Sequence, residues 1–246
     1  MPVIDDLSAE ILAEVLSGRP VRTYPALLST EADAEAWARA GGPAGAVVTA
    51  GYLAAPRGRA GLPWPQHADR GLVFSLLLRP DLPAQREGWP YVAAALGIAD
   101  VLGCEVAIRW PDEVYGPNGR AAALGMRTEL GPDRLRWCVL TVLVEQAAPP
   151  RGALLAAVVA AVEGRLDDPV DALLATYRDR CATLGRHVRA RLIPLGPAGP
   201  QVEGEAVDVR ADGALVIRTD DGRRAVVPPA NLGMLDELDA ARDLSS

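Results

Sequence analysis

Residues 45–64, GAVVTAGYLAAPRGRAGLPW, join an apolar stretch to an arginine–glycine loop. Residues 45–53 are β-branched and apolar, which is typical of a strand buried in a sheet. The loop at residues 56–65 consists largely of Gly, Pro and Arg, and a second apolar strand is predicted at residues 72–78, where Arg79-Pro80 ends it. The segment predicts neighbouring buried strands joined by a basic loop.

Further elements extend this sheet in both directions. Thr30 is a suitable N-cap for a helix at residues 31–40, and apolar residues spaced by three and four predict another helix at residues 89–102. Strands are predicted at residues 105–110, 121–128 and 136–144, and helices at residues 152–163 and 169–184. This order predicts an α+β fold in which helices pack on a mixed or antiparallel sheet.

The character of the chain changes after residue 195. A Pro/Gly linker at residues 196–200 precedes short strands predicted at residues 204–209, 214–219 and 223–227, which are separated by Ala-Asp-Gly and Asp-Asp-Gly turns. We therefore expect a main domain at residues 1–195 and a small β-barrel at residues 201–246, with a frayed helical tail from Glu237.

The charged residues exclude several functions. The chain has 246 residues with 25 basic and 32 acidic side chains, and every basic one is arginine. No Schiff-base lysine, P-loop lysine or lysine general base can therefore form. Codon usage in a GC-rich genome and selection against lysine explain the missing lysine equally well. The net charge of −7 argues against nucleic acid or an anionic membrane as a partner, and the longest apolar stretch, residues 153–162, is too short to span a bilayer.

Cysteine and histidine usage predicts a cytoplasmic protein without a resident metal. Cys104, Cys138 and Cys181 lie far apart and form no CxxC motif, and the N-terminus lacks the features of a signal peptide. His67 and His187 are too distant in the sequence to suggest a metal site. Surface or packing roles are expected for both histidines.

Arginine, tryptophan and hydroxyl residues stand out in three short motifs. Arg57-Gly58-Arg59-Ala60-Gly61 presents guanidinium groups on a glycine loop, which suits phosphate or carboxylate oxygens, although a solvated basic turn has the same composition. Arg109-Trp110-Pro111-Asp112 ends a predicted strand, and its Trp is explained equally well as a half-buried strand end. Ser29-Thr30 precedes a helix and could be only its cap.

The order and spacing of these motifs resemble the biotin–protein ligases and, more loosely, the lipoate ligases. The resemblance covers about residues 22–235 and includes the D-G-x-L-x-x-x-x-x-D-G rhythm of the C-terminal module. It implies the monofunctional type, with an SH3-like C-terminal barrel. It also implies a reaction in which ATP, its Mg²⁺ and biotin form an acyl-adenylate, and a lysine of a carrier protein then attacks that anhydride.

The resemblance assigns roles residue by residue. The expected catalytic residues are Arg120, Arg57 and Arg59, with Arg120 at the position of the family's lysine. The expected substrate-binding residues are Ser29, Thr30, Leu53, Gly58 and Gly61. The expected nucleotide-binding residues are Trp64, Trp110, Asp112 and Glu145. No resident metal site is expected, although Asp112 and Glu113 could hold the Mg²⁺ that accompanies ATP.

Several of these positions depart from the family pattern. Leu53 replaces a biotin-contacting glutamine, Glu145 replaces an asparagine, and Thr141 and Leu143 replace glycines. Arg120 keeps the charge of the lysine but is bulkier and planar, so it does not reproduce the geometry of an ammonium group. Because a displacement of about 1 Å can cost about 100-fold in rate, we expect biotinylation to be weakened or absent.

Three functions therefore remain open. The chain is an adenylate-forming ligase for biotin or a related acid, a degenerate relative that binds a nucleotide, acyl ligand or carrier protein without turnover, or an enzyme of specialised metabolism that uses another acid and amine. Each would dock a partner through the exposed edge of the main sheet. Homodimerisation through that edge is the alternative.

Overall fold

A seven-stranded sheet forms the centre of the protein, and the sequence predicts it as a mixed or antiparallel sheet with every strand except β1 and β5. The computed structural model describes residues 6–238, except residues 56, 62, 65–70, 148–149 and 197. The strand order is β1-β2-β3-β7-β6-β5-β4, and only β1 and β2 pair in parallel, so the sheet is mixed. The strands are β1 Val21–Leu27, β2 Val47–Leu53, β3 Leu72–Leu78, β4 Ala107–Arg109, β5 Glu113–Gly116, β6 Gly119–Leu130 and β7 Leu135–Val144.

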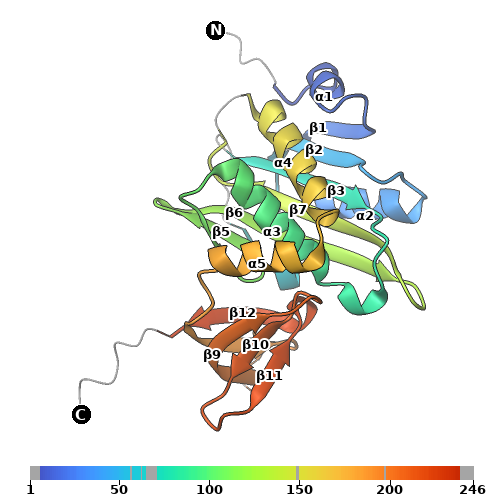
Figure 1. Ribbon diagram of the computed structural model, residues 1–246. Coiled ribbons are helices and arrows are strands. Elements are labelled where there is room, and N and C mark those ends of the chain that lie inside the picture. Colours follow the sequence, from blue (N-terminus) through green and yellow to red (C-terminus); the bar gives the residue numbers. More distant parts are fainter. Residues whose placement is uncertain are drawn as a thin grey trace.

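Helices cover both faces of this sheet (Figure 1). The helices are α1 Ala9–Val15, α2 Thr30–Arg39, α3 Trp89–Leu102, α4 Arg151–Leu166 and α5 Val170–Arg180. On one face, α3 and α4 pack against the sheet with Phe74, Trp89 and Leu124 in the core. On the other face, α2 covers β7 through Ala34 and Ala38, which pack with Val139.

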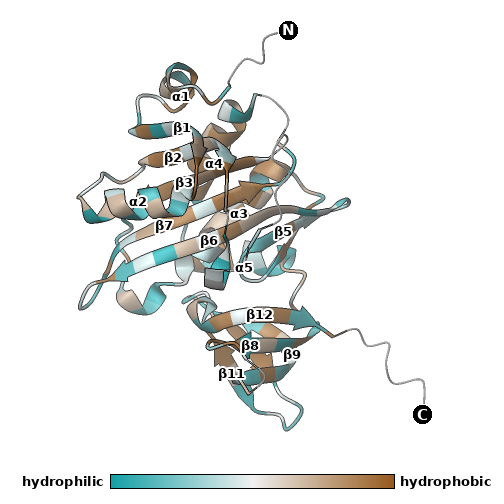
Figure 2. Cartoon of the chain, turned by 180° about the vertical axis from the view of Figure 1, so that it is seen from behind, coloured by the Kyte–Doolittle hydropathy of each residue, from teal (hydrophilic) through white to brown (hydrophobic). Residues whose placement is uncertain are grey.

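The hydropathy of each element matches its position. In Figure 2, β3 and β7 are predominantly hydrophobic, whereas α2 carries hydrophilic residues as well. The centre of α3 is buried on every side, which explains its uniformly apolar sequence. None of the helices in the described part of the chain is long and apolar enough to cross a bilayer.

The C-terminal part of the chain forms a second, antiparallel sheet of five strands, in the order β11-β10-β9-β8-β12. Its strands are β8 His187–Leu192, β9 Gln201–Val209, β10 Leu215–Arg218, β11 Arg224–Val227 and β12 Leu232–Glu237. Within the described residues β11 and β12 form open edges, so the expected closed barrel is not confirmed. A barrel would require these edge strands to pair, but in the described part of the chain β12 pairs with β8 alone.

The predicted linker at residues 196–200 lies inside this second sheet, between β8 and β9. The sheet therefore begins eight residues before the expected boundary at residue 195, with His187 of β8. The expected helical tail from Glu237 is wrong at its start, because Glu237 ends β12. Residues 239–246 lie outside the described part of the chain.

Close backbone contact joins the second sheet to the main unit. The Trp110 indole donates a hydrogen bond to the carbonyl of Gly213 at 2.8 Å, and Arg86 Nε donates to the carbonyl of Ala211 at 3.0 Å. A Cβ on Gly213 would lie 2.5 Å from the Gly88 carbonyl oxygen, and one on Gly88 would lie 2.5 Å from the Asp212 carbonyl oxygen. Only glycine allows this approach.

We expect Gly213→Ala to destabilise the protein more than Gly222→Ala does. Both glycines have a φ of +80°, but a Cβ at Gly222 meets nothing within 4 Å. Gly222→Ala should cost about 1 kcal/mol for the left-handed backbone, and Gly213→Ala about 2 kcal/mol more because it also forces backbones apart. Urea unfolding of both variants measures the difference, and equal losses would contradict the contact.

Candidate functional site

The arginine–glycine loop lies on the face of the main sheet that α2 partly covers. Arg57 and Pro63 form an isolated antiparallel bridge, and Arg57 Nη1 donates to the carbonyl of Gly61 at 3.0 Å. These contacts close the loop into a hairpin, with Trp64 directly after it. A Cβ on Gly58 would overlap the Trp64 indole, so Gly58 lets the loop backbone lie directly on the ring.

Two cross-strand rows form the floor under this loop. Val73, Leu143 and Ala123 lie opposite one another on β3, β7 and β6, and all three pack around the Trp64 ring, which is 8% exposed. This first row is entirely apolar.

The second row lies two residues away from the first on the same strands, and it is partly polar. It consists of Ser75, Thr141 and Gly125. Ser75 Oγ donates to Thr30 Oγ1 at 2.9 Å and shares a hydrogen bond of 2.8 Å with Thr141 Oγ1. The floor therefore consists of an apolar row beside a chain of buried hydroxyl groups that bind one another.

Arg59 fastens the loop to two other parts of the molecule. Its Nε donates to Asp112 Oδ2 at 2.9 Å, and its Nη1 donates to the carbonyls of Leu232 and Gly233 at 2.7 and 2.9 Å. Burial raises the pKa of the Asp112 carboxyl to about 6, with Arg59 acting in the opposite direction and Glu113 adding to the rise. Arg59 thus connects the loop, the end of the Trp110-Pro111 segment and β12.

Arg120 is held between two carboxylates. Its Nε donates to Glu145 Oε1 at 2.6 Å and its Nη1 to Glu113 Oε1 at 3.0 Å. An irregularity in the β5–β6 pairing at Val114 and Tyr115 accompanies this arrangement. The cluster carries one positive and two negative formal charges, so Arg120 offers no net positive charge in this arrangement.

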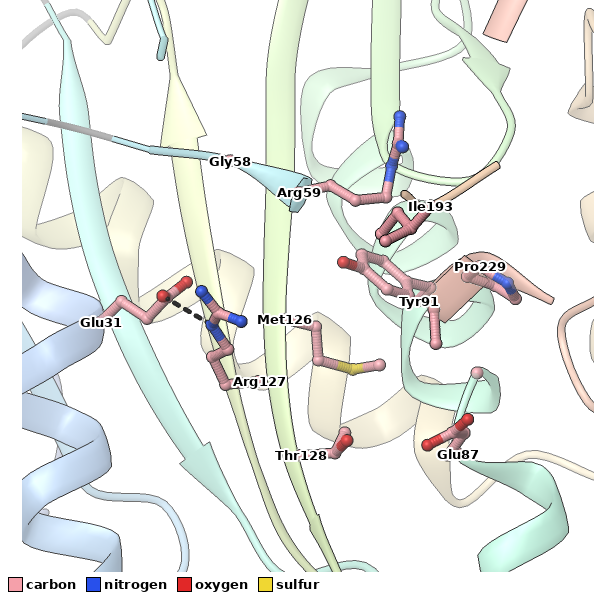
Figure 3. A pocket seen from close by; sticks show the side chains of 12 residues that line it. Glu31, Gly58, Arg59, Glu87, Tyr91, Met126, Arg127, Thr128, Ile193 and Pro229 are labelled. Carbon is pink, nitrogen blue, oxygen red and sulfur yellow. Dashed lines mark hydrogen bonds and ion pairs between the residues drawn. The ribbon is translucent and has the colours of Figure 1, made fainter. Parts of the chain in front are cut away.

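A pocket of about 230 Å³ lies beside the loop, between the main unit and the second sheet (Figure 3). Arg127 Nε donates to Glu31 Oε1 at 3.0 Å on one side of it. The Tyr91 hydroxyl points into the pocket, and burial raises its pKa well above the usual range, with Asp112 adding to the rise. The pocket is lined by Glu31, Gly58, Arg59, Glu87, Gly88, Tyr91, Met126, Arg127, Thr128, Ile193, Pro229 and Ala230.

The structure connects the arginine–glycine loop with Trp64 and, through Arg59, with Asp112, and it pairs Arg120 with Glu145. The loop residues lie over the floor, Thr30 joins the hydroxyl chain, and Ser29 caps α2 by accepting a hydrogen bond from the Ala32 amide. Leu53 is buried at the end of β2, and Trp110 is buried at the junction with the second sheet. Their contacts with biotin and nucleotide stay predictions.

Sequence reasoning missed several residues of the site. Ser75 lies in the predicted strand at residues 72–78 and Tyr91 in the predicted helix at residues 89–102, but neither was given a role, because β3 and α3 bring them to the site only through long-range packing. Within the described residues no three His, Cys, Asp or Glu side chains group as metal ligands, and His67 lies outside these residues.

The buried Asp112 should make stability depend on pH. Its pKa is about 6 when folded, against an ordinary value of 3.8. Between these values the unfolded chain loses its proton first, so the free energy of unfolding should fall as pH rises from about 4 to about 6. Urea unfolding of the unchanged protein and of Asp112→Asn measures the free energy of unfolding at each pH, and the difference between the two proteins isolates the contribution of Asp112. The same slope against pH in both proteins between about pH 4 and pH 6 would refute the prediction.

Comparison with known proteins places the chain in a family. Residues 183–227 match the family described as "Biotin protein ligase C terminal domain". The chain is 30% identical over 228 residues to the biotin--[acetyl-CoA-carboxylase] ligase of Mycobacterium tuberculosis (strain ATCC 25618 / H37Rv), which covers 82% of this chain and 84% of that protein. It is also 30% identical over 131 residues to the bifunctional ligase/repressor BirA of Bacillus subtilis (strain 168), covering 51% of this chain and 40% of that protein.

Solved structures show the same fold. The biotin protein ligase of Aquifex aeolicus in complex with biotin and ATP superposes with a TM-score of 0.67 at 18% identity, covering 89% of this chain and 99% of that one. A biotin protein ligase-like protein of unknown function from Silicibacter gives a TM-score of 0.65 at 15% identity, over 86% of this chain and 95% of that one. The chain belongs to the biotin protein ligase family.

Proposed function

We propose that the chain is an ATP-dependent ligase that joins biotin, or a related carboxylic acid, to a lysine of a carrier protein. The observation that carries this proposal is the closed Arg57–Gly61 hairpin over the sheet floor, in a chain that matches a biotin ligase over 84% of that protein's length. Free thiols at Cys104, Cys138 and Cys181 accord with a reducing compartment, and we propose the cytoplasm.

The reaction has two steps. A carboxylate oxygen of the acid attacks the α-phosphorus of ATP, and pyrophosphate leaves with the electrons of the broken P–O bond. The neutral amine of the carrier lysine then attacks the acyl carbon, losing a proton, and AMP leaves. Both steps develop negative charge on phosphate oxygens, which positive groups held in place stabilise.

The arginines of the loop suit different tasks in this reaction. Arg57 is exposed, so its guanidinium is accessible to phosphate or carboxylate oxygens. Arg59 is largely buried and bound to Asp112 and β12, which suits it to holding the loop in place. Asp112 and Glu113 are each engaged by an arginine, so we assign no protein ligand to the Mg²⁺ that accompanies ATP.

The two carboxylates around Arg120 support the expectation that catalysis by this chain is weakened. A cation paired with Glu113 and Glu145 cannot lend its full charge to a phosphate unless those pairs break. The same pairing, together with the burial of Trp64, favours the alternative that the chain binds ligands without turnover.

Isotope exchange between pyrophosphate and ATP tests the function. We expect exchange that depends on added biotin, followed by biotinylation of a carrier domain detected by mass spectrometry. Binding of ATP by calorimetry without exchange for biotin, lipoate or octanoate would instead support the binding protein.

Restoring a lysine should raise the rate. We expect Arg120→Lys combined with Glu145→Asn to increase biotin-dependent exchange by about 10- to 100-fold, because it supplies an ammonium group and removes a competing carboxylate. Arg109→Lys is the matched control, since Arg109 is paired with Glu237 near the second sheet. An unchanged rate in the double variant would show that Arg120 is not the defect.

We expect the carrier to dock at the edge of β6 at Thr128, beyond Met126, whose amide already bonds the Tyr91 hydroxyl. β5 pairs only with residues 119–123 of β6, and the Leu124 amide donates to the Asp112 carbonyl on that side. By strand alternation the Thr128 amide points to the same side, beside the pocket, where the described residues include no partner strand. An extended segment of the carrier can add there as a strand.

Removal of the Thr128 amide hydrogen should affect only the second step of the reaction, in which the carrier lysine attacks the acyl carbon. We expect Thr128→Pro to raise the KM for the carrier several-fold while pyrophosphate exchange is unchanged, because proline donates no hydrogen bond. Thr128→Ala keeps the amide and is the control. Equal loss in both variants would place carrier docking elsewhere.

A further inference from the structure

The pocket between the main unit and the second sheet contains a carboxylate without a cationic partner. Its charged side chains are Glu31, Glu87, Arg59 and Arg127. Arg127 pairs with Glu31, and Arg59 binds Asp112 and β12, with its guanidinium turned away from the pocket in Figure 3. Glu87 forms no ion pair within the described residues, and burial raises the pKa of its carboxyl. A cation in the pocket would therefore stabilise the ionised form of Glu87.

The residues on either side of Glu87 hold its backbone against the second sheet. Arg86 Nε donates to the carbonyl of Ala211 at 3.0 Å, and a Cβ on Gly88 would lie 2.5 Å from the Asp212 carbonyl oxygen. Glu87 is therefore part of the junction between the two parts of the chain, and its carboxylate belongs to the pocket that this junction encloses.

A buried hydroxyl group also faces this pocket. The Tyr91 side chain is 3% exposed, and its hydroxyl points into the pocket (Figure 3). The Met126 amide donates to the hydroxyl oxygen, and burial raises the pKa of Tyr91 well above the usual range, so the hydroxyl keeps its proton. A hydroxyl oxygen has two acceptor positions. The second position of Tyr91 is open to an N–H group in the pocket.

The pocket also has an apolar wall, to which both parts of the chain contribute. Met126 belongs to β6, whereas Ile193 and Pro229 belong to the C-terminal part, and Ile193 is 48% exposed. The volume of about 230 Å³ is below the range of about 300–1,000 Å³ that is typical of sites for drug-sized ligands. The pocket therefore suits a narrow, partly apolar group rather than a whole nucleotide.

We propose that this pocket binds a primary amine on an aliphatic chain, with the ammonium group beside Glu87 and Tyr91 and the chain along Met126 and Ile193. An ammonium group has three N–H donors and no acceptor, which matches a carboxylate and a hydroxyl oxygen. A hydrocarbon chain of about four or five carbons needs only apolar contact. The inference rests on the proposed function and widens its second substrate: free alkylamines accept the acyl group as well as a lysine of a carrier protein.

The pocket adjoins the parts of the molecule that we assign to the reaction. Gly58 and Arg59 of the arginine–glycine loop line it, and so does Thr128, where we expect the carrier to dock. In the transfer, the amine nitrogen forms a bond to the acyl carbon, and the bond from that carbon to the phosphate oxygen breaks. AMP leaves with the electrons of this bond, and the two protons that the ammonium group loses pass to water.

Calorimetry with n-pentylamine at neutral pH, without ATP, tests the pocket on the whole chain. We expect Glu87→Gln to weaken binding at least 10-fold, because the amide has the shape of the carboxylate without its charge. Glu105→Gln is the matched control, since it removes the same charge at an exposed position outside the pocket. Thermal unfolding verifies that each variant is folded. No binding to the unchanged protein, or equal binding to Glu87→Gln, overturns the proposal.

The length of the amine tests the apolar wall independently of Glu87. Each buried CH₂ group should increase the affinity about fourfold, so we expect n-pentylamine to bind at least 10-fold more tightly than ethylamine. Ile193→Ala should reduce this difference, because it removes part of the wall. Equal affinities of the unchanged protein for the two amines would show that the chain lies outside the pocket and would contradict the proposal.

Formation of biotinyl pentylamide from ATP, biotin and n-pentylamine, measured by mass spectrometry, tests the transfer. We expect at least 10-fold less product with Glu87→Gln at low amine concentration. Equal yields in the two proteins would mean that adenylate reacts in solution, which overturns the proposal.

The binding measurements separate this inference from the proposed function, because they involve no ATP. Binding of n-pentylamine that depends on Glu87, without pyrophosphate exchange, would refute the ligase function and support the amine pocket. Biotin-dependent exchange, with equal n-pentylamine affinities in Glu87→Gln and the unchanged protein, would support the ligase and refute the amine pocket.

Discussion

The Arg59 guanidinium holds together parts of the molecule that are distant in the sequence. It binds Asp112 between β4 and β5 and the backbone of β12, while its own backbone belongs to the loop over the sheet floor. A planar group with several fixed donors can satisfy all these acceptors at once, which a lysine could not do. The position of the loop, and with it the cover of the floor, depends on this one side chain.

Charge is distributed unevenly around the site as a result. Arg59 and Arg120 are both engaged by carboxylates, which leaves Arg57 as the exposed guanidinium of the loop. Arg59 beside the buried Asp112 favours its ionised form, and burial still raises its pKa. The same residues that stabilise the junction of the two sheets therefore limit the positive charge available for chemistry.

Local signals predicted the regular core well. The helix at residues 89–102 and the strand at residues 72–78 were predicted at their observed bounds, because Gly or Pro marks their ends. β1 was missed because Pro25 interrupts its pattern, and β8 because its alternation with Arg189 and Arg191 offers only Val188 and Ala190 as buried positions. For the site, the sequence identified the loop and Thr30, but the contacts of Ser75 and Arg120 depend on strand register, which no local pattern encodes.

The second sheet starts before the Pro/Gly segment and continues after it, and this limits how the chain can be divided. β8 lies between β9 and β12 in space, although residues 193–200 separate it from β9 in the sequence. A cut at residue 196 would leave β8 in the N-terminal fragment without β9 and β12, its two neighbours in the sheet. In the C-terminal fragment β9 and β12 would each lose the pairing with β8, so both fragments would expose unpaired strand edges that favour aggregation. The Pro/Gly segment is therefore an internal loop of one folded unit, and a gene fusion or domain exchange in this family member belongs ahead of His187, after α5.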